Sequence, residues 1–271
     1  MLTKSQKTMC MLLLLGLSAC GTSEVDSSDE LNGRSDPPTG TLKSDVIVGT
    51  LDWMSVTALP ANSPERARSK AVGYLQFNIR HNGNVVTFSR CTAWLASLDV
   101  VITNSHCINT QAEAVGARVA FNYEEGAGSR IWYDCSTLIR SWGDGSDDDM
   151  SALRCQPRNG VYPGEEYGYL RVSGTDVARS TPIYVIHQNC DYETDEDCAA
   201  TKKYSPGKVL NTYSTSYWMS HDADTLKGSS GGPMLSRSTH EVVGLNRGNN
   251  GTVNMAVRGS ILGARLAELG L

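Results

Sequence analysis

The sequence has little positive charge and few histidines. Its 271 residues include 24 Lys and Arg against 29 Asp and Glu, a formal net charge of −5, and the basic residues form no patch. Nucleic acid is therefore not an expected partner. Of the five histidines, His221 lies beside an aspartate, but no second cluster at zinc-like spacing accompanies it. We therefore expect neither a metal ion nor a cofactor.

Long apolar runs are also lacking. The run Met9–Leu17 is too short to span a membrane as a mature helix, and it follows two lysines, as in a targeting segment. It ends in Leu17-Ser18-Ala19-Cys20-Gly21, which resembles the lipobox of bacterial lipoproteins. The resemblance implies a lipoprotein signal peptide over residues 1–19 and lipidation of Cys20. An ordinary secretory signal is the alternative.

Residues 20–45 are rich in Ser, Asp, Gly, Thr and Pro and contain almost no large apolar side chains. Such a segment cannot form a core, and we interpret it as a flexible polar tether or a propeptide. As a random coil it would span about 25–30 Å on average. We expect an extracytoplasmic protein, lipid-anchored to a bacterial membrane (the outer membrane or the cell surface), which proteolysis in the tether would release.

Residues 46–271 are long enough for one large domain or two small barrels. Ala71–Ile79 alternates between two faces, whereas Val100–Ile102 and Ile183–Ile186 are short apolar runs. Turn residues separate these segments, so the pattern predicts an all-β chain of many short strands. Only Ile261–Leu269 has helical spacing, and we expect it to pack as a C-terminal helix.

The stretch Gly228-Ser229-Ser230-Gly231-Gly232-Pro233 is typical of a loop that presents one hydroxyl. Glycines allow positive φ and a close approach to a substrate. In such a loop the backbone N–H groups of Gly228 and Ser230 can point together at a developing oxyanion, as acyl transfer requires. A small-residue turn between two strands is the alternative.

A serine hydroxyl becomes a nucleophile beside a base that a third group orients. His106 follows a strand–turn–strand pattern and stands next to a cysteine. The other candidates, His81, His187 and His240, stand in polar, turn-like surroundings and are expected at the surface. Asp149, the last of three consecutive acids, precedes a predicted strand that would draw it inward. An acidic surface loop or a weak calcium loop is the alternative for this segment.

The segments Thr103-Asn104-Ser105-His106-Cys107, Asp149-Met150-Ser151-Ala152-Leu153 and Gly228–Pro233 resemble the three signatures of the chymotrypsin/trypsin-like serine protease superfamily, in its His, Asp, Ser order. The similarity covers roughly Val46 to the C-terminus and points to the bacterial branch related to the glutamyl endopeptidases. It implies a trypsin-like protease domain over residues 46–271, with two six-stranded antiparallel β-barrels and a C-terminal helix. It also implies a monomer that acts on protein or peptide substrates.

The same resemblance implies a serine endopeptidase that works through an acyl-enzyme. Ser230 would attack the peptide carbonyl, His106 would serve as base and then as acid, and Asp149 would fix the imidazole. Activity is expected to rise with pH through the histidine range, because the base must be neutral. The alternatives are a catalytically inactive homologue that acts as a surface binding lipoprotein, and an esterase. The sequence offers no lipase-type Gly-x-Ser-x-Gly elbow between a strand and a helix.

Specificity is the ambiguous part of the sequence. The resemblance implies a pocket formed by Asp224, Thr225, Asn246, Gly248 and Asn249. A carboxylate at Asp224 would favour basic residues before the cleaved bond, unless Arg247 neutralises it. Asn246 stands where the glutamyl endopeptidases carry a histidine, and this departure argues against a preference for glutamate.

Activation departs from the pancreatic pattern as well. Ser229 carries no charge and cannot form an ion pair with a newly freed amino terminus. Val46-Ile47-Val48-Gly49 nevertheless resembles a mature start, so cleavage after Asp45 remains an alternative to a chain in which Val46 simply opens the first strand.

Cysteine usage agrees with an extracytoplasmic location. Cys10 leaves with the signal and Cys20 is the lipidation candidate, which leaves six of the eight cysteines. The resemblance implies a disulfide between Cys91 and Cys107. Pairing the remaining four by arithmetic suggests Cys135–Cys155 and Cys190–Cys198, with free buried thiols as the alternative.

Overall fold

The computed structural model describes residues 46–81, 84–143, 148–190, 199–213 and 216–271. The chain divides into two compact units, Met1–Arg34 and Ser35–Leu271, and all of the described residues belong to the second. The expected signal peptide (1–19) and tether (20–45) lie outside them. Of the helices described, none is both long and apolar enough to cross a membrane.

The first half of the domain is an antiparallel sheet of seven strands with the order β6-β5-β2-β3-β4-β8-β7. Its strands are β2 (Val72–His81), β3 (Asn84–Leu95), β4 (Val100–Thr103), β5 (Arg118–Ala120), β6 (Trp132–Asp134), β7 (Thr137–Ser141) and β8 (Ser151–Arg154). The alternating segment becomes β2 and the short apolar run becomes the fully buried β4. The sheet curls around a core but does not close through the pairings described.

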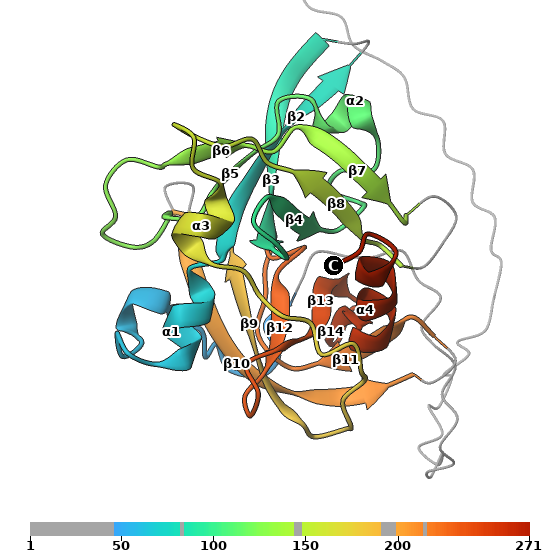
Figure 1. Cartoon of the computed structure of the whole chain (residues 1–271). Coiled ribbons are helices and arrows are strands. Elements are labelled where there is room, and N and C mark those ends of the chain that lie inside the picture. The colour runs from blue at the N-terminus through green and yellow to red at the C-terminus, as the bar shows by residue number, and fades with distance from the viewer. Residues whose placement is uncertain (1–45, 82–83, 144–147, 191–198, 214–215) are drawn as a thin grey trace, which may run out of the picture. The chain divides into compact units, whose positions relative to one another are not determined.

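The second half is a sheet in which six strands close into a barrel. Its strands are β1 (Met54–Ser55), β9 (Pro182–Gln188), β10 (Lys202–Thr212), β11 (Trp218–His221), β12 (Pro233–Ser236), β13 (Val242–Asn249) and β14 (Asn254–Arg258). Strand β9 pairs with both β10 and β12, which closes the ring, and β1 adds to the edge of β10. Figure 1 shows the two sheets one above the other. The predicted all-β, trypsin-like fold is confirmed.

Helices are short and lie outside the sheets. They are the 3-10 helix η1 (Val56–Ala58), α1 (Pro64–Ser69), α2 (Gln111–Ala114), α3 (Pro163–Tyr167) and α4 (Gly259–Ala267). The C-terminal helix, red in Figure 1, contacts β13 and β14 through its buried Leu262 and Leu266. It confirms the helix predicted from the spacing of Ile261–Leu269, with bounds two residues earlier.

One hydrophobic cluster spans both halves. Buried side chains of β3 and β4, such as Leu95 and Ile102, belong to the same cluster as Tyr184 of β9 and Leu245 of β13. A backbone hydrogen bond also joins the halves, from the Thr92 N–H group to the Ser230 carbonyl at 2.8 Å. The seam between the sheets therefore lies where the candidate nucleophile stands.

Candidate active site

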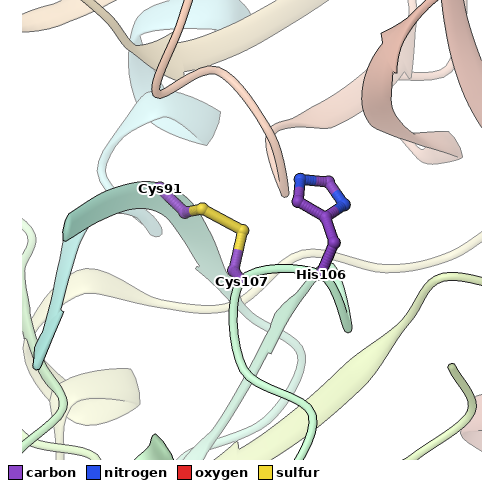
Figure 2. Close-up of side chains that lie close together, drawn as sticks. All are labelled: Cys91, His106 and Cys107. Atoms are coloured by element: carbon purple, nitrogen blue, oxygen red, sulfur yellow. A yellow bond between two sulfur atoms is a disulfide. The ribbon is translucent and has the colours of Figure 1, made fainter. Parts of the chain in front are cut away.

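His106 lies in the turn that follows β4. The Cys107 N–H donates to the Asn104 carbonyl at 3.2 Å, which tightens this turn. A disulfide joins Cys107 to Cys91 of β3 and fixes the turn to the sheet (Figure 2). The two sulfur atoms and the imidazole are close enough together for a metal ion, but sulfur atoms bonded to each other offer no thiolate ligands. The cluster is therefore a structural brace beside an imidazole.

Asp149 stands two residues before the start of β8 and is buried, with 5% of its surface exposed. Its φ of 39° is in the left-handed region, which Asp tolerates better than most residues. Its carbonyl accepts a hydrogen bond from the Asn104 side chain at 2.8 Å, and the Ser105 hydroxyl donates to its carboxylate at 2.9 Å. These bonds hold Asp149 against the turn that carries His106.

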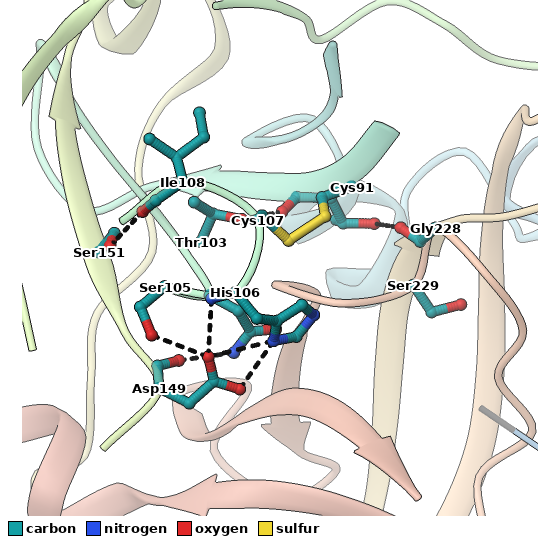
Figure 3. Close-up of a disulfide and its surroundings, with 12 residues drawn as sticks. Cys91, Thr103, Ser105, His106, Cys107, Ile108, Asp149, Ser151, Gly228 and Ser229 are labelled. Carbon is teal, nitrogen blue, oxygen red and sulfur yellow. Dashed lines mark hydrogen bonds and ion pairs between the residues drawn. A yellow bond between two sulfur atoms is a disulfide. The ribbon is translucent and has the colours of Figure 1, made fainter. Parts of the chain in front are cut away.

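The carboxylate of Asp149 and the imidazole of His106 form a close pair (Figure 3). Nδ1 of His106 is 2.9 Å from Oδ2 and 3.1 Å from Oδ1, and the backbone N–H of His106 donates to Oδ1 at 3.0 Å. With the carboxylate ionised, Nδ1 carries the hydrogen, which leaves Nε2 as the free basic nitrogen. The His106 side chain is 39% exposed, so a substrate can reach it.

Arg247 of β13 is a third member of this cluster. Its Nε donates to Oδ2 of Asp149 at 3.1 Å, and its guanidinium lies 3.9 Å from the centre of the Trp218 ring. Burial by itself would raise the pKa of Asp149, but the hydrogen bonds and charge of His106 and the charge of Arg247 outweigh burial and lower it. The carboxylate is therefore ionised at neutral pH.

The loop of Ser230 is fixed to the first sheet by two glycines and one threonine. Gly228 and Gly231 have φ of 105° and 85°, and a Cβ on Gly231 would come within 2.1 Å of the Thr92 carbonyl oxygen. The Thr92 hydroxyl donates to the Gly228 carbonyl at 2.9 Å, in addition to the backbone bond to Ser230. Only glycine permits this approach, which explains why glycines flank the serine pair.

Three polar groups of this loop have no hydrogen-bond partner among the residues that the structure describes. They are the N–H groups of Gly228 and Ser230 and the hydroxyl of Ser230. Ser229 differs, because its hydroxyl is fully buried and bonded to Nδ1 of His187 at 2.8 Å. Of the two serines, Ser230 is therefore the one with a free hydroxyl.

The residues expected to form the specificity pocket are mostly engaged elsewhere. Asp224 is 1% exposed, and its two oxygens accept from the backbone N–H groups of Val48 and Asp52 at 2.7 and 2.9 Å. The Thr225 N–H donates to the Val46 carbonyl at 3.3 Å. Arg247, considered above as a partner that neutralises Asp224, contacts Asp149 instead.

The other pocket candidates lie on β13. Asn246 is fully buried, accepts from Nε2 of His221 at 3.1 Å and donates to the Ser229 carbonyl at 3.2 Å. Asn249 is 1% exposed and its side-chain oxygen accepts from the Gly251 N–H. Gly248, between them, is buried as well. The pocket assignment stays a prediction.

A cavity of about 350 Å³ opens beside the His106–Asp149 pair instead. It is lined by Ser105, His106, Asn109, Glu113, Gly143, Asp149 and Arg247. A second hollow, of about 250 Å³, flanks His106 on the side of β2, next to Phe77 and Ile79. The exposed face of the imidazole thus borders space for a ligand on both sides.

One expectation for the histidines is wrong. His187 was expected at the surface from its polar neighbours in sequence, but it lies in β9 and is fully buried. Burial lowers its pKa to about 3, with smaller contributions from the charges of Lys203 and His221. His240 is partly buried, and its Nδ1 is 3.1 Å from the Tyr184 hydroxyl. His81 ends β2, and its side chain is outside the described residues.

The cysteines follow the expected pairing where the structure describes them. The disulfides Cys91–Cys107 and Cys135–Cys155 are present. Cys190 is also disulfide-bonded, and its expected partner Cys198 lies outside the described residues. The second disulfide links the end of β6 to the end of β8, the strand that follows Asp149.

Sequence comparison agrees with this fold. Residues 91–245 match the family model of the trypsin-like peptidase domain. The match covers more than half of the chain and includes His106, Asp149 and Ser230. The chain belongs to the trypsin-like peptidase family. A search of curated protein sequences gave no match.

Solved structures of proteases share the fold at low sequence identity. A Glu endopeptidase has a TM-score of 0.61 and 17% identity, covering 83% of this chain and 99% of that one. The thermostable serine protease AL20 from an extremophilic microorganism has a TM-score of 0.56 and 16% identity, covering 75% and 99%. The protease Anisep from Arthrobacter nicotinovorans has a TM-score of 0.55 and 17% identity, covering 70% and 90%.

Proposed function

We propose that this protein is a serine endopeptidase with the catalytic triad Ser230, His106 and Asp149. The observation that carries the proposal is the buried Asp149 carboxylate 2.9 Å from Nδ1 of a half-exposed His106. Such a pair leaves Nε2 free to act as a base, and the hydrogen bond from Thr92 holds Ser230 against β3. Membership of the trypsin-like peptidase family supports the same assignment.

In the proposed reaction, Ser230 Oγ attacks the peptide carbonyl carbon while His106 Nε2 takes the hydroxyl proton. The N–H groups of Gly228 and Ser230, free of hydrogen bonds within the described residues, bind the oxyanion that forms. His106 then gives the proton to the leaving amine, which leaves an acyl group on Ser230. Water hydrolyses the ester by the same steps, and Asp149 remains ionised throughout.

A preference for basic residues before the cleaved bond rests on Asp224. Its carboxylate accepts hydrogen bonds from Val48 and Asp52, so a substrate cation would have to share oxygens that are already bonded. The preference therefore has the support of charge and position alone. Kinetics on a peptide panel varied at that one residue tests it, and preferential cleavage after Glu or an apolar residue would refute it.

We also propose that the protein is lipid-anchored outside the cytoplasm. The disulfides Cys91–Cys107 and Cys135–Cys155 favour an oxidising compartment, and the lipobox-like sequence at Cys20 provides the anchor. Incorporation of labelled palmitate into the wild type but not into Cys20→Ser is the expected result. Equal labelling of both proteins would refute the anchor without affecting the proposed chemistry.

Cleavage of a denatured protein tests the endopeptidase proposal. Wild type is expected to degrade the substrate, and Ser230→Ala is expected to retain less than about one thousandth of that rate. Ser129→Ala, which removes an exposed hydroxyl far along the chain, is the matched control and should behave like wild type. A folded, disulfide-bonded wild type that cleaves nothing would favour the inactive binding homologue.

A further inference from the structure

Hydrogen bonds of Ser229 hold the loop that carries the proposed nucleophile. The Ser229 side chain points away from His106 (Figure 3). Its hydroxyl accepts a hydrogen bond from the Leu226 N–H at 3.1 Å and pairs with Nδ1 of His187 at 2.8 Å. Ser229 lies between the two residues whose N–H groups face the developing oxyanion, so its position fixes theirs.

Two further bonds hold the Ser229 carbonyl. It accepts from the Gly232 N–H at 2.9 Å and from the Asn246 side chain at 3.2 Å. Asn246 is held in turn by Nε2 of His221 at 3.1 Å. The four side chains His187, Ser229, Asn246 and His221 are all fully buried, and we call them the loop brace. The brace joins the loop to β9 directly through His187, and to β11 through Asn246 of β13 and His221.

His187 is a costly residue for the position that it holds. Its Nε2 has no hydrogen-bond partner among the described residues, and a buried polar atom without a partner destabilises the folded state. A leucine would fill similar space without that cost. Among the described residues, the hydrogen bond to Ser229 is the one polar contact of the His187 side chain.

Resting on the proposed function, we propose that His187 is a positioning residue for the oxyanion-binding loop, acting through Ser229. The uncharged hydrogen bond between His187 and Ser229 holds the loop in place of an ion pair, which Ser229 cannot form. Trp53, from the segment that follows Val46, lies edge-on to the His187 ring at 6.0 Å between centroids and covers it. His187 itself touches no substrate atom.

The test replaces His187 in two ways that differ in one hydrogen bond. In His187→Asn, the side-chain amide stands where Nδ1 was and can still bond to the Ser229 hydroxyl. In His187→Leu, the volume is kept and the hydrogen bond is lost. Both variants would be assayed for kcat and KM on one peptide substrate, and for the affinity of a peptide aldehyde of the same sequence.

A misplaced oxyanion donor weakens transition-state binding more than substrate binding. We expect His187→Leu to lower kcat by about 10-fold to 100-fold, with KM changed by less than about 3-fold. The aldehyde, whose hemiacetal oxygen occupies the oxyanion site, should lose affinity by a similar factor. His187→Asn should stay within about 3-fold of wild type in each measurement.

Two results would overturn the proposal: a folded His187→Leu with wild-type kcat, or one whose loss lies in KM alone. If His187→Leu fails to fold, Ser229→Ala removes the same bond with a smaller change and is expected to show the same loss of kcat. Failure of the proposed function is a separate outcome. In that case wild type and Ser230→Ala would show equal activity, whatever the residue at position 187.

Discussion

From the charge of Arg247 we predict where on the pH axis activity should be lost at low pH. The midpoint of this loss, which is the acid limb of the pH profile, depends on that charge. Arg247 Nε and His106 Nδ1 both bond to Oδ2 of Asp149, at 3.1 and 2.9 Å. The two nitrogen atoms are therefore no more than about 6 Å apart, and the guanidinium charge disfavours a second positive charge beside Asp149. Replacing Arg247 with glutamine removes that charge but keeps a hydrogen-bond donor. Activity in Arg247→Gln should then fail at a higher pH than in wild type.

Coulomb's law gives the size of the shift. Two unit charges about 6 Å apart interact with roughly 0.7 kcal/mol at a dielectric constant of 80 and roughly 2.8 kcal/mol at 20. Since one pH unit corresponds to about 1.4 kcal/mol, the midpoint of the acid limb in Arg247→Gln should lie roughly 0.5 to 2 pH units above that of wild type. The two acidic residues that line the same cavity, Glu113 and Asp149, are unchanged in this comparison.

The assay is kcat/KM for one peptide substrate between pH 4 and pH 9, at constant ionic strength. Arg247→Lys, which keeps the charge but not the planar group over Trp218, is the matched control and should retain the wild-type midpoint within about 0.3 pH units. Circular dichroism at each pH shows whether the variants remain folded. An unchanged midpoint in a folded Arg247→Gln, or a shift toward lower pH, would refute the electrostatic reasoning.

Three other results are expected. Replacing Cys91 and Cys107 together by alanine removes a disulfide between residues 16 positions apart, and should lower the free energy of unfolding in urea by about 3 kcal/mol. A decrease below about 1 kcal/mol would contradict this prediction. The Val46 N–H donates to the Asn254 side chain as a backbone amide. A chain that keeps the residues before Val46 should therefore have the same kcat/KM as a chain cleaved after Asp45. Activity only in the cleaved chain would refute this prediction. Burial lowers the pKa of His187 from 6.5 to about 3 and that of His221 from 6.5 to about 4. Below pH 6.5 the unfolded chain therefore binds more protons than the folded one, and the free energy of unfolding should fall between pH 6.5 and pH 4. In His187→Asn this fall should be smaller by about 1.4 kcal/mol per pH unit, because one of the two histidines is gone.

The sequence pattern predicted the parts of the fold that local periodicity determines. The alternation of Ala71–Ile79 became β2, the run Val100–Ile102 became β4, and the helical spacing near the C-terminus became α4. Two-residue alternation and 3.6-residue spacing indicate which face of a strand or helix packs against the core. They can therefore be recognised without knowing which other segments form that core. The same logic placed Asp149 inward, since a buried strand follows it.

Contacts between distant segments were beyond the sequence pattern. Arg247 meets Asp149 across 98 positions, and Asp224 meets Val48 across 176. The prediction for His187 is wrong because its polar neighbours in sequence, Gln188 and Asn189, are typical of a surface turn, although both are buried too. A polar side chain is buried wherever distant partners satisfy it, and one sequence does not reveal those partners.

Mapping a covalent adduct tests the central claim most directly. A fluorophosphonate probe reacts with a serine hydroxyl that a neighbouring base activates. Peptide mass spectrometry of the labelled wild type should place one adduct on Ser230, with none on Ser229, and His106→Ala should abolish it. An adduct on Ser229, or a folded protein that takes up no probe, would contradict the assignment of Ser230 as the nucleophile.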